Sequence, residues 1–583
     1  MTTKPEQEQA RAPSRSFLKS AFLGSLESDL LLPFPESPSG EREMVDTLAD
    51  GFTRFASEKI DAERFDRESH FPEDVRRELG AMGLFGLIVP EAQGGLGMSQ
   101  WSYCELMELV AGVDASTAAT IGAHQSIGIK ALLMFGTEAQ KSRYLPSLAT
   151  GERVAAFALT ESGAGSDANN LSTTAKLMED GEHYVLNGTK IWITNGGFAD
   201  VFTVFACTGT RHVDGKERNE LTAFIVTRDM EGVSTGPPED KLGLRASSTT
   251  TVSLDNVRVP TDHVLGEVGR GFNVAVEVLN EGRLGLAAGC VGIAKVLLRD
   301  SLEFAREREA FGRSISEFEM IQAKFAWMAI DIYVMESMVY LTASLADGKE
   351  HDFSLESAAC KIYCSEKLWR IVNDALQING GNGFMRHLPY ERTLRDARIN
   401  LIFEGTNEIL RIFTSLSGVQ RSSRYLKEFA EALKDPVGSF GVLTEFASRR
   451  IKRTVSRASL DSVHPSLSQQ ASRLGNAVSD LASATEGAIY HHRHEIIDRQ
   501  FIQARLADMA LDVFAMAATI ARTDGLLRKG SAEADHAEQM CARFVETTWR
   551  RVRRNAKRVD FETDAPLSEI AKAVYDRGGY RVP

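Results

Sequence analysis

The chain has 583 residues, of which 43% are hydrophobic and 25% are charged, a composition typical of a soluble globular protein. At about 150 residues per domain, such a length predicts roughly four domains. The 80 acidic residues outnumber the 67 Lys and Arg, and the net charge of −13 argues against nucleic acid as a partner. Uncharged runs are too short for a transmembrane span, and the N-terminus lacks a secretory pattern, so we expect that the protein is not secreted.

Hydrophobic periodicity and composition divide the chain into six segments and predict an α+β fold that is mainly α. In chain order the predicted segments are an N-terminal arm (1–40), a helical domain (41–153), a middle β domain (154–262), a helical bundle (263–420), a linker (421–466) and a C-terminal helical domain (467–583). The bundle is expected to contain four or five antiparallel helices.

Short runs rich in β-branched and aromatic residues fill the middle domain without a helix-length interruption, which predicts a compact antiparallel sheet. Asn187-Gly188 stands between the runs His183–Leu186 and Lys190–Thr194. This dipeptide between two β-rich runs predicts a hairpin turn.

Six cysteines are spread without a CxxC pair or the spacing of a zinc site, so we expect free thiols, a reducing compartment and no metal. Cys360 and Cys364 are four residues apart, which predicts that both lie on one face of a buried helix.

The chain has neither GxGxxG nor GxxxxGK[ST], so a bound dinucleotide would need a scaffold other than a Rossmann fold or P-loop. The loop Leu159–Asp167 follows a predicted strand and contains two glycines with small side chains. Its backbone amides could approach an anionic or heteroaromatic group closely, although an ordinary turn has the same composition.

Two further segments admit a structural and a functional interpretation. Trp192 lies in a predicted strand, on the same side as Thr194, and is either a core tryptophan or a platform for a planar ligand. Gln377–Gly383 contains three glycines in four residues and is either a helix C-cap or backbone packed against a ligand.

Glu404 follows Ile402 and Phe403 and precedes Gly405, just before a predicted helix. A lone loop glutamate is usually solvated. Here the apolar approach predicts partial burial, which would raise the pKa of the carboxyl towards values useful to a general base.

Taken together, these segments resemble the acyl-CoA dehydrogenase family, in order and with its gaps, from about residue 41 to 420. The N-terminal arm, the helix around Gly122–Gly128 and the C-terminal helical domain resemble the very-long-chain branch of that family. The resemblance implies FAD bound between the β domain and the bundle, in a homodimer whose cofactor sites use residues of both subunits.

The resemblance also assigns site residues. Those implied to bind FAD are Phe157, Ala158, Leu159, Thr160, Gly165, Ser166, Trp192, Ile193, Thr194, Arg308, Phe311, Gln377, Ile378, Asn379, Gly380, Gly381, Thr406, Asn407 and Glu408. Those implied to bind the substrate are Ser166, Asn280, Arg283 and Gly405.

The implied reaction is the first step of fatty-acid β-oxidation, on long-chain acyl-CoA. Glu404 would remove the α-proton, the flavin would take the β-hydride, and electron-transfer flavoprotein would receive the electrons. Two alternatives stay open: an acyl-CoA oxidase that reduces oxygen, and a non-catalytic partner in the assembly of a respiratory complex. Both the bacterial cytoplasm and the mitochondrial matrix are compatible locations.

Two weaker features concern lipids. Gly122, Ala123 and Gly128 either leave room for a long acyl chain or permit tight helix packing. A basic amphipathic stretch within residues 436–457 could contact an anionic bilayer or form a solvated helix face. Its cations are Arg449, Arg450, Lys452, Arg453 and Arg457.

Overall fold

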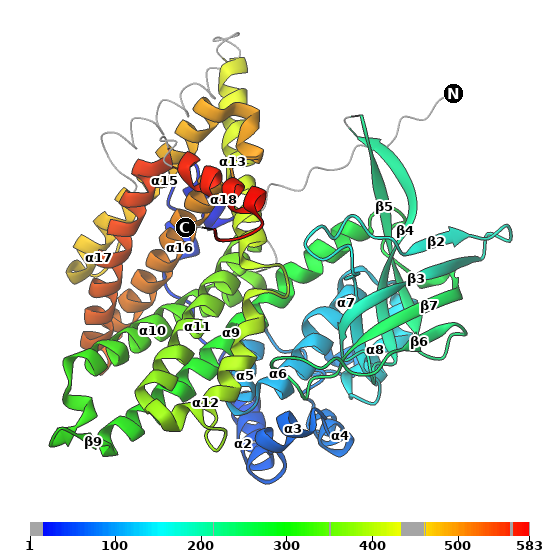
Figure 1. Ribbon diagram of the computed structural model, residues 1–583, viewed down its shortest axis with the longest axis horizontal. Helices are drawn as coiled ribbons and strands as arrows, with labels where there is room; N and C mark the ends of the chain where they lie inside the picture. The colour runs from blue at the N-terminus through cyan, green and yellow to red at the C-terminus, as the bar shows by residue number, and fades with distance from the viewer. Residues whose placement is uncertain are drawn as a thin grey trace. The chain divides into compact units, whose positions relative to one another are not determined.

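The computed structural model describes residues 15–213, 215–348, 351–432, 460, 462–559 and 564–581 (Figure 1). The chain divides into two compact units, one made of residues 36–347 and 360–407 and the other of residues 1–35, 348–359 and 408–583. The cations of the predicted membrane-contacting stretch, Arg449 to Arg457, lie outside the described residues. The boundaries of the six predicted segments stay a prediction.

The larger unit begins with the predicted helices. They are α2 (Arg42–Lys59), α3 (Ala62–Glu68), α4 (Glu73–Ala81), α5 (Gln100–Val113), α6 (Ala115–Gly122), η3 (Ala123–Gly128), α7 (Lys130–Phe135) and α8 (Glu138–Ala149). Side-chain caps start several of them: Asp114 accepts from the Thr117 amide at 2.7 Å, and Thr137 and Gln140 form a capping box on α8.

The helix that includes Gly122 and Gly128 contains a π-helical turn, η3, which turns His124 into the core. His124 Nδ1 accepts from the Ala155 amide at 2.9 Å, and Nε2 lies 3.0 Å from the Leu148 carbonyl oxygen. A Cβ on Gly128 would lie 2.9 Å from the Ala155 carbonyl oxygen. Close packing therefore accounts for Gly128, whereas Gly122 has only an ordinary contact with Met107.

The middle domain is a sheet of eight strands beside α7 and α8 (Figure 1). The strands are β1 (Ala155–Ala158), β2 (Thr174–Leu177), β3 (His183–Thr194), β4 (Val201–Val213), β5 (Lys216–Thr227), β6 (Val233–Thr235), β7 (Thr249–Pro260) and β8 (Val264–Leu265). The order is β6-β7-β3-β2-β4-β5-β8, with β1 pairing β4. Most pairs are antiparallel as predicted, but β1 and β2 each pair with β4 in parallel.

Strand β4 is buried on both faces. Phe205 packs into a core with the helices, while Phe202 and Val204 pack into a second core on the opposite side of the sheet. The rigid centre of the domain is therefore next to β1, whose C-terminal end leads into the glycine loop.

The predicted hairpin at Asn187-Gly188 is wrong. His183–Thr194 is one continuous strand, β3, and the dipeptide lies at a register shift in the pairing with β7. A Cβ on Gly188 would lie 2.3 Å from Thr173 Oγ1, so glycine is required by a neighbouring segment rather than by a turn. Asn187 Oδ1 instead accepts from the Asn256 amide on β7 at 2.8 Å.

Helices return after the sheet. They are α9 (Gly271–Glu307), α10 (Glu319–Asp347), α11 (Ser354–Phe384), α12 (Tyr390–Ala397), η6 (Arg398–Leu401) and α13 (Asn407–Ala432), with a small hairpin, β9 (Glu309–Ala310) and β10 (Arg313–Ser314), after α9. Cys360 and Cys364 are buried on α11, as predicted. Among the described helices, α10 is long and apolar enough to cross a membrane, but 78% of its most apolar window is buried, as in a core helix.

The smaller unit contains α15 (Ser468–His492), α16 (Gln500–Arg528), α17 (Ala534–Val559) and α18 (Ala565–Arg577), which agree with the predicted C-terminal helices. The described part of the N-terminal arm is more than a linker. It forms α1 (Phe17–Ala21), whose Phe17 ring lies 5.9 Å from that of Phe514 on α16. Ser16 Oγ donates to the buried Glu356 carboxylate at 2.8 Å.

Candidate functional site

The loop after β1 is anchored by a buried ion pair. Glu161 is 3% exposed and accepts from Lys190 Nζ at 2.7 Å, from the Ser172 amide at 2.7 Å and from the Thr173 amide at 3.0 Å. Burial would raise the pKa of Glu161, but the hydrogen bonds from Lys190, Ser172 and Thr173 outweigh it and lower the pKa to about 2. The carboxylate is therefore a permanent anchor for the loop.

Beyond this anchor the loop is open. Gly163 and Gly165 are exposed, and among the described residues a Cβ on either would meet nothing within 4 Å. Phe157, Ala158 and Leu159 point into the cores beneath, so only their backbone can face a ligand. Thr160 is half-buried and Ser166 is exposed, which leaves their hydroxyls accessible.

Trp192 is not a core tryptophan. The β3–β7 pairing shifts between Lys190 and Ile193, so Ile191 and Trp192 form a bulge, and Trp192 has a φ of 58° and is 61% exposed. The Ile191 amide donates to the Thr160 carbonyl at 2.9 Å. The strand therefore brings an open indole face next to the glycine loop, while Ile193 is buried and Thr194 half-buried.

The predicted helix end at Gln377–Gly383 is an interruption inside α11, because Gly380 has φ 57° and ψ −134°. Gly380 and Gly381 are exposed, and among the described residues a Cβ on either would meet nothing within 4 Å. Ile378 and Asn379 are buried, and Asn379 Nδ2 donates to the Ala375 carbonyl at 2.9 Å. Gln377 is exposed beside the glycines.

Phe311 lies in the turn of the β9–β10 hairpin, and Arg308 is the C-cap residue of α9 directly before it. Phe311 has a φ of 54° and is 96% exposed, and Arg308 is also exposed. A phenylalanine held this far out of the fold is typical of a surface that another molecule covers.

These features fit the predicted dinucleotide. The open glycine backbone and the nearby hydroxyls can bind phosphates, because no side chain obstructs them. The exposed indole of Trp192 can pack against a planar ring. The sequence identified the loop but did not reveal the Glu161–Lys190 pair, whose only signal was Lys190, a charged residue within the β-rich run that forms β3.

Glu404 lies in a tight turn between η6 and α13, with φ 56°, and Gly405 follows with φ 91°. Among the described residues, the enclosed Oε2 of Glu404 has no hydrogen-bond partner. Burial raises the pKa of Glu404 to about 6, and the nearby Arg283 and Lys361 oppose that rise. An enclosed carboxylate with a free oxygen and this pKa can accept a proton near neutral pH.

Two buried cations donate hydrogen bonds to the backbone carbonyls of the Glu404 turn. Arg283, 6% exposed, donates from Nε to the Glu404 carbonyl at 3.1 Å and from Nη1 to Asn280 Oδ1 at 2.7 Å. Lys361, 0% exposed, donates from Nζ to the Gly405 carbonyl at 2.8 Å. Asn280, Arg283 and Gly405 are thus brought together with Glu404, and Lys361 is a member of the site that the sequence did not reveal.

The other predicted residues near the turn divide by burial. Asn407 is 2% exposed and accepts from Lys361 Nζ at 2.8 Å. Thr406 is half-buried, and Glu408 is exposed in the first turn of α13. Asn407 thus supports the turn from inside the fold, while Thr406 and Glu408 remain accessible.

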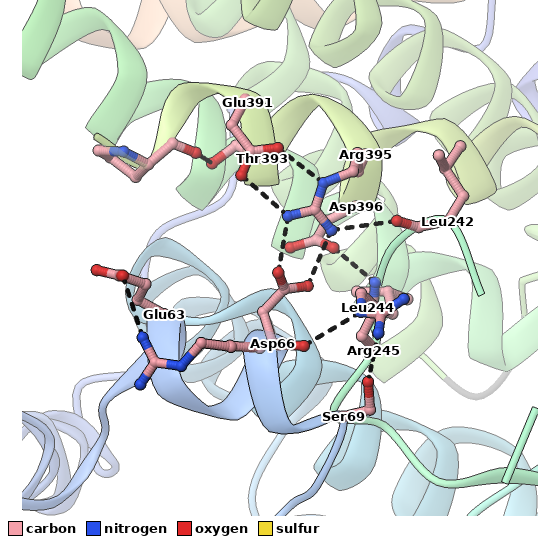
Figure 2. Close-up of polar contacts among 12 residues, drawn as sticks. Glu63, Asp66, Ser69, Leu242, Leu244, Arg245, Glu391, Thr393, Arg395 and Asp396 are labelled. Atoms are coloured by element: carbon pink, nitrogen blue, oxygen red, sulfur yellow. Dashed lines mark hydrogen bonds and ion pairs between the residues drawn. The ribbon is translucent and has the colours of Figure 1, made fainter. Parts of the chain in front are cut away.

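A polar network anchors α12 (Figure 2). In the sequence, α12 leads through η6 to Glu404. Arg395 on α12 donates to both oxygens of Asp66 on α3, at 2.9 and 2.7 Å, and to the Leu242 carbonyl at 3.1 Å. Asp396 accepts from the Leu244 amide at 2.5 Å, and burial raises its pKa to about 7. The α12 segment is therefore tied to the first helical domain and to the loop before β7.

Comparisons with known proteins agree with this arrangement. The family descriptions that match are Acyl-CoA dehydrogenase, N-terminal domain (42–152), middle domain (156–257) and C-terminal domain (269–415), and ACAD9/ACADV, C-terminal domain (465–580). The chain is 40% identical to the mitochondrial very long-chain specific acyl-CoA dehydrogenase of Bos taurus, over 98% of this chain and 89% of that protein.

A bacterial relative and a solved structure are also similar. The chain is 36% identical to a probable acyl-CoA dehydrogenase of Bacillus subtilis (strain 168), over 90% of this chain and 87% of that protein. The crystal structure of an acyl-CoA dehydrogenase complexed with FAD from Bacillus anthracis matches with a TM-score of 0.78 and 31% identity, over 96% of this chain and 95% of that chain.

Proposed function

The chain belongs to the acyl-CoA dehydrogenase family, and from that premise we propose that it oxidises long-chain or very-long-chain acyl-CoA to trans-2-enoyl-CoA. It is an FAD-dependent oxidoreductase of fatty-acid β-oxidation. The long-chain preference is supported by the match of residues 465–580 to the ACAD9/ACADV C-terminal domain and by the similarity to very long-chain specific relatives.

The observation that carries the proposal is the free, enclosed Oε2 of Glu404. In the proposed mechanism this oxygen removes the α-proton of the thioester. A carboxyl with a pKa of about 6 is mostly ionised at neutral pH, yet it is basic enough to take a proton as the enolate-like charge develops. The Glu404 backbone amide is proposed to donate to the thioester carbonyl.

The cofactor residues have separate proposed roles. The bound flavin supplies the acceptor for the β-hydride. Thr160 and the amides of Gly165 and Ser166 would hold it at the loop after β1. Trp192 and Thr194 would contribute to its binding from β3, and Gln377–Gly381 and Thr406–Glu408 would supply the remaining contacts. Ser166, Asn280, Arg283 and Gly405 are proposed to contact the substrate, and the 2.7 Å hydrogen bond holds Asn280 and Arg283 as one unit.

A homodimer is part of the proposal, because Arg308 and the exposed Phe311 would reach the cofactor of the second subunit. A reducing compartment, either bacterial cytoplasm or mitochondrial matrix, is supported by the six free cysteines and by relatives of both kinds. Peripheral membrane contact through residues 436–457 stays a proposal. Its test is whether deletion of that stretch weakens binding to anionic liposomes.

Electron-transfer flavoprotein is the proposed electron acceptor, with an oxidase as the alternative. Peroxide formation in air, measured with and without an added acceptor protein, separates the two. A role in assembling a respiratory complex is less favoured, because the catalytic carboxylate and its supports are intact. Recovery of respiratory subunits with the tagged protein would nevertheless establish such a role.

The proposal is tested with the purified holoenzyme. The protein should be yellow, and its flavin absorbance should bleach under anaerobic conditions when a long-chain acyl-CoA is added, more readily than with a short-chain acyl-CoA. A colourless protein that cannot be loaded with FAD, or a flavin that no acyl-CoA in a chain-length series reduces, would refute the function.

A further inference from the structure

Lys361 is fully buried, which is unusual for a lysine, because this side chain is almost never buried without a strong partner. It lies on α11, and its ammonium donates to the Gly405 carbonyl and to Asn407 Oδ1, each at 2.8 Å. Both acceptors lie within three residues of Glu404. The burial of Lys361 is therefore compensated by the turn that carries the base.

Asn407 is oriented so that its oxygen faces Lys361. Its Nδ2 donates to Ser365 Oγ at 3.0 Å and to Glu366 Oε1 at 3.2 Å, both on α11. Because the nitrogen is engaged by these acceptors, the oxygen is left for the ammonium. Lys361, Ser365 and Glu366 together fasten the start of α13 to one face of α11.

The turn needs such support, because Glu404 is a non-glycine residue at φ 56°. A left-handed conformation costs about 1 kcal/mol or more for a residue with a Cβ. Arg283 holds the Glu404 carbonyl, and Lys361 holds the next carbonyl, that of Gly405. In a planar trans peptide, fixing a carbonyl also fixes the following amide, so Lys361 sets the plane between Gly405 and Thr406.

We propose that Lys361 is a positioning residue for catalysis, which locks the Glu404 turn in its left-handed geometry and keeps the base ionised by its positive charge. The proposal rests on the proposed role of Glu404 as the base. It gives α11 a function in proton transfer, in addition to its glycine interruption near the cofactor.

The charge effect can be separated from the other groups that face Glu404. Arg283 and Lys361 are the cations that oppose the rise in its pKa. In the described parts of the chain, Tyr103 on α5 and Cys290 on α9 also interact electrostatically with Glu404. Burial raises the pKa of Cys290 to about 12 and that of Tyr103 above its ordinary value, so both stay neutral during an assay.

Lys361 itself also interacts with Glu366, Arg283 and Cys290. Burial lowers its pKa to about 8, with Glu404 opposing, so the ammonium is charged at the acidic and neutral pH values where Glu404 titrates. Loss of the Lys361 charge should therefore move the acidic limb of the pH profile, whereas a merely structural lysine would leave that limb in place.

The experiment compares Lys361→Met and Lys361→Arg with wild-type holoenzyme. For each protein, the FAD content, thermal unfolding and the pH dependence of kcat and kcat/KM on a long-chain acyl-CoA are measured. We expect Lys361→Met to lower kcat about 100-fold with little change in KM, because the base is displaced. Its acidic limb should shift upward by about 1 pH unit, because a cation beside the carboxylate is lost.

Lys361→Arg keeps the charge but changes the donor geometry. It should therefore keep the wild-type acidic limb while kcat falls about tenfold, so it tests the proposal even where Lys361→Met does not fold. Lys324→Met is the matched control, because Lys324 pairs with Asp374 away from the turn and Asp374 retains Arg370. Lys324→Met should keep both the wild-type kcat and the wild-type acidic limb of the pH profile.

The positioning role would be overturned if Lys361→Met folded, bound FAD and kept the wild-type acidic limb of the pH profile. It would also be overturned if Lys361→Arg kept the wild-type kcat. Failure of wild-type flavin to bleach with any acyl-CoA would instead remove the proposed function itself.

Discussion

The larger unit contains two glutamates whose surroundings shift the carboxyl pKa in opposite directions. Glu161 receives hydrogen bonds from Lys190, Ser172 and Thr173, and its pKa falls to about 2. Glu404 is half-buried, its enclosed Oε2 has no hydrogen-bond partner among the described residues, and its pKa rises to about 6. Donors that satisfy both oxygens therefore keep Glu161 ionised, whereas an oxygen without a donor leaves Glu404 more basic, as its proposed role requires.

The two glutamates also differ in the segments to which they are bonded. Glu161 fixes the loop after β1 to Lys190 on β3, two residues before Trp192, and so lies within the proposed cofactor site. Glu404 sits on a left-handed turn whose carbonyls are held by Arg283 and Lys361. Glu161 needs all of its hydrogen-bond donors to keep its low pKa. Glu404, in its proposed role, needs one oxygen without a donor so that this oxygen can accept a proton.

The largest expected effect is that of Glu404→Gln. The variant should keep its FAD and its fold but lose turnover by about 10³-fold or more, because an amide cannot accept the α-proton. Steady-state rates and flavin absorbance provide the measurement. Glu41→Gln, which changes a carboxylate bonded to the Ser99 amide at 3.1 Å, is the control and should keep normal turnover. Near-normal activity of Glu404→Gln would refute its role as base.

Glu161→Gln should act on stability and cofactor retention rather than on the chemical step. Removing one partner of a buried ion pair leaves Lys190 uncompensated, so the free energy of unfolding should fall by about 3 kcal/mol. Denaturant unfolding and FAD titration measure the two effects. Replacing both partners, as Glu161→Leu with Lys190→Met, should recover part of the stability. If Glu161→Gln instead lost turnover while retaining FAD and stability, the contrast with Glu404 would fail.

Acidity should separate the two carboxylates. Between pH 6 and pH 5, kcat/KM should fall by up to about tenfold as Glu404 becomes protonated. The folded pKa of Glu161 is depressed, so its stabilising contribution is complete above its unfolded pKa of 4.5 and is lost as the pH falls towards 2. The free energies of unfolding of wild type and Glu161→Gln should therefore differ by the same amount at pH 6 and at pH 5. Equal free energies of unfolding at pH 5 would contradict the lowered pKa of Glu161.

Trp192→Leu should have the smallest effect. Loss of an aromatic stacking surface is worth about 1 kcal/mol, which corresponds to a few-fold weaker binding of FAD. Trp192→Phe should retain most of the affinity, and titration of apoprotein with FAD measures both variants. If Trp192→Leu bound FAD with unchanged affinity, the Trp192 ring would not contribute to FAD binding.

Local sequence patterns correctly predicted structural features such as the partial burial of Glu404 and its raised pKa. Glu404 after two apolar residues, the glycine loops and the alternation of helical and β segments all carry their signal in adjacent positions. The hairpin prediction failed at Asn187-Gly188, because the demand for glycine comes from Thr173 on another segment. Lys361 was missed for the same reason: on a helix it reads as one cation among apolar neighbours, and its acceptors lie more than 40 residues later.

The short helix α1 links the beginning of the chain to its end. Ser16 and Glu356 are 340 positions apart, and Phe22 bonds to Ser422 across 400 positions. During synthesis, the ribosome therefore releases Phe17 long before its partner Phe514 on α16 exists, whereas residues 36–347 and 360–407 can assemble earlier. The Phe17 side chain therefore stays uncovered until α16 has been made, so the smaller unit is completed after the larger one.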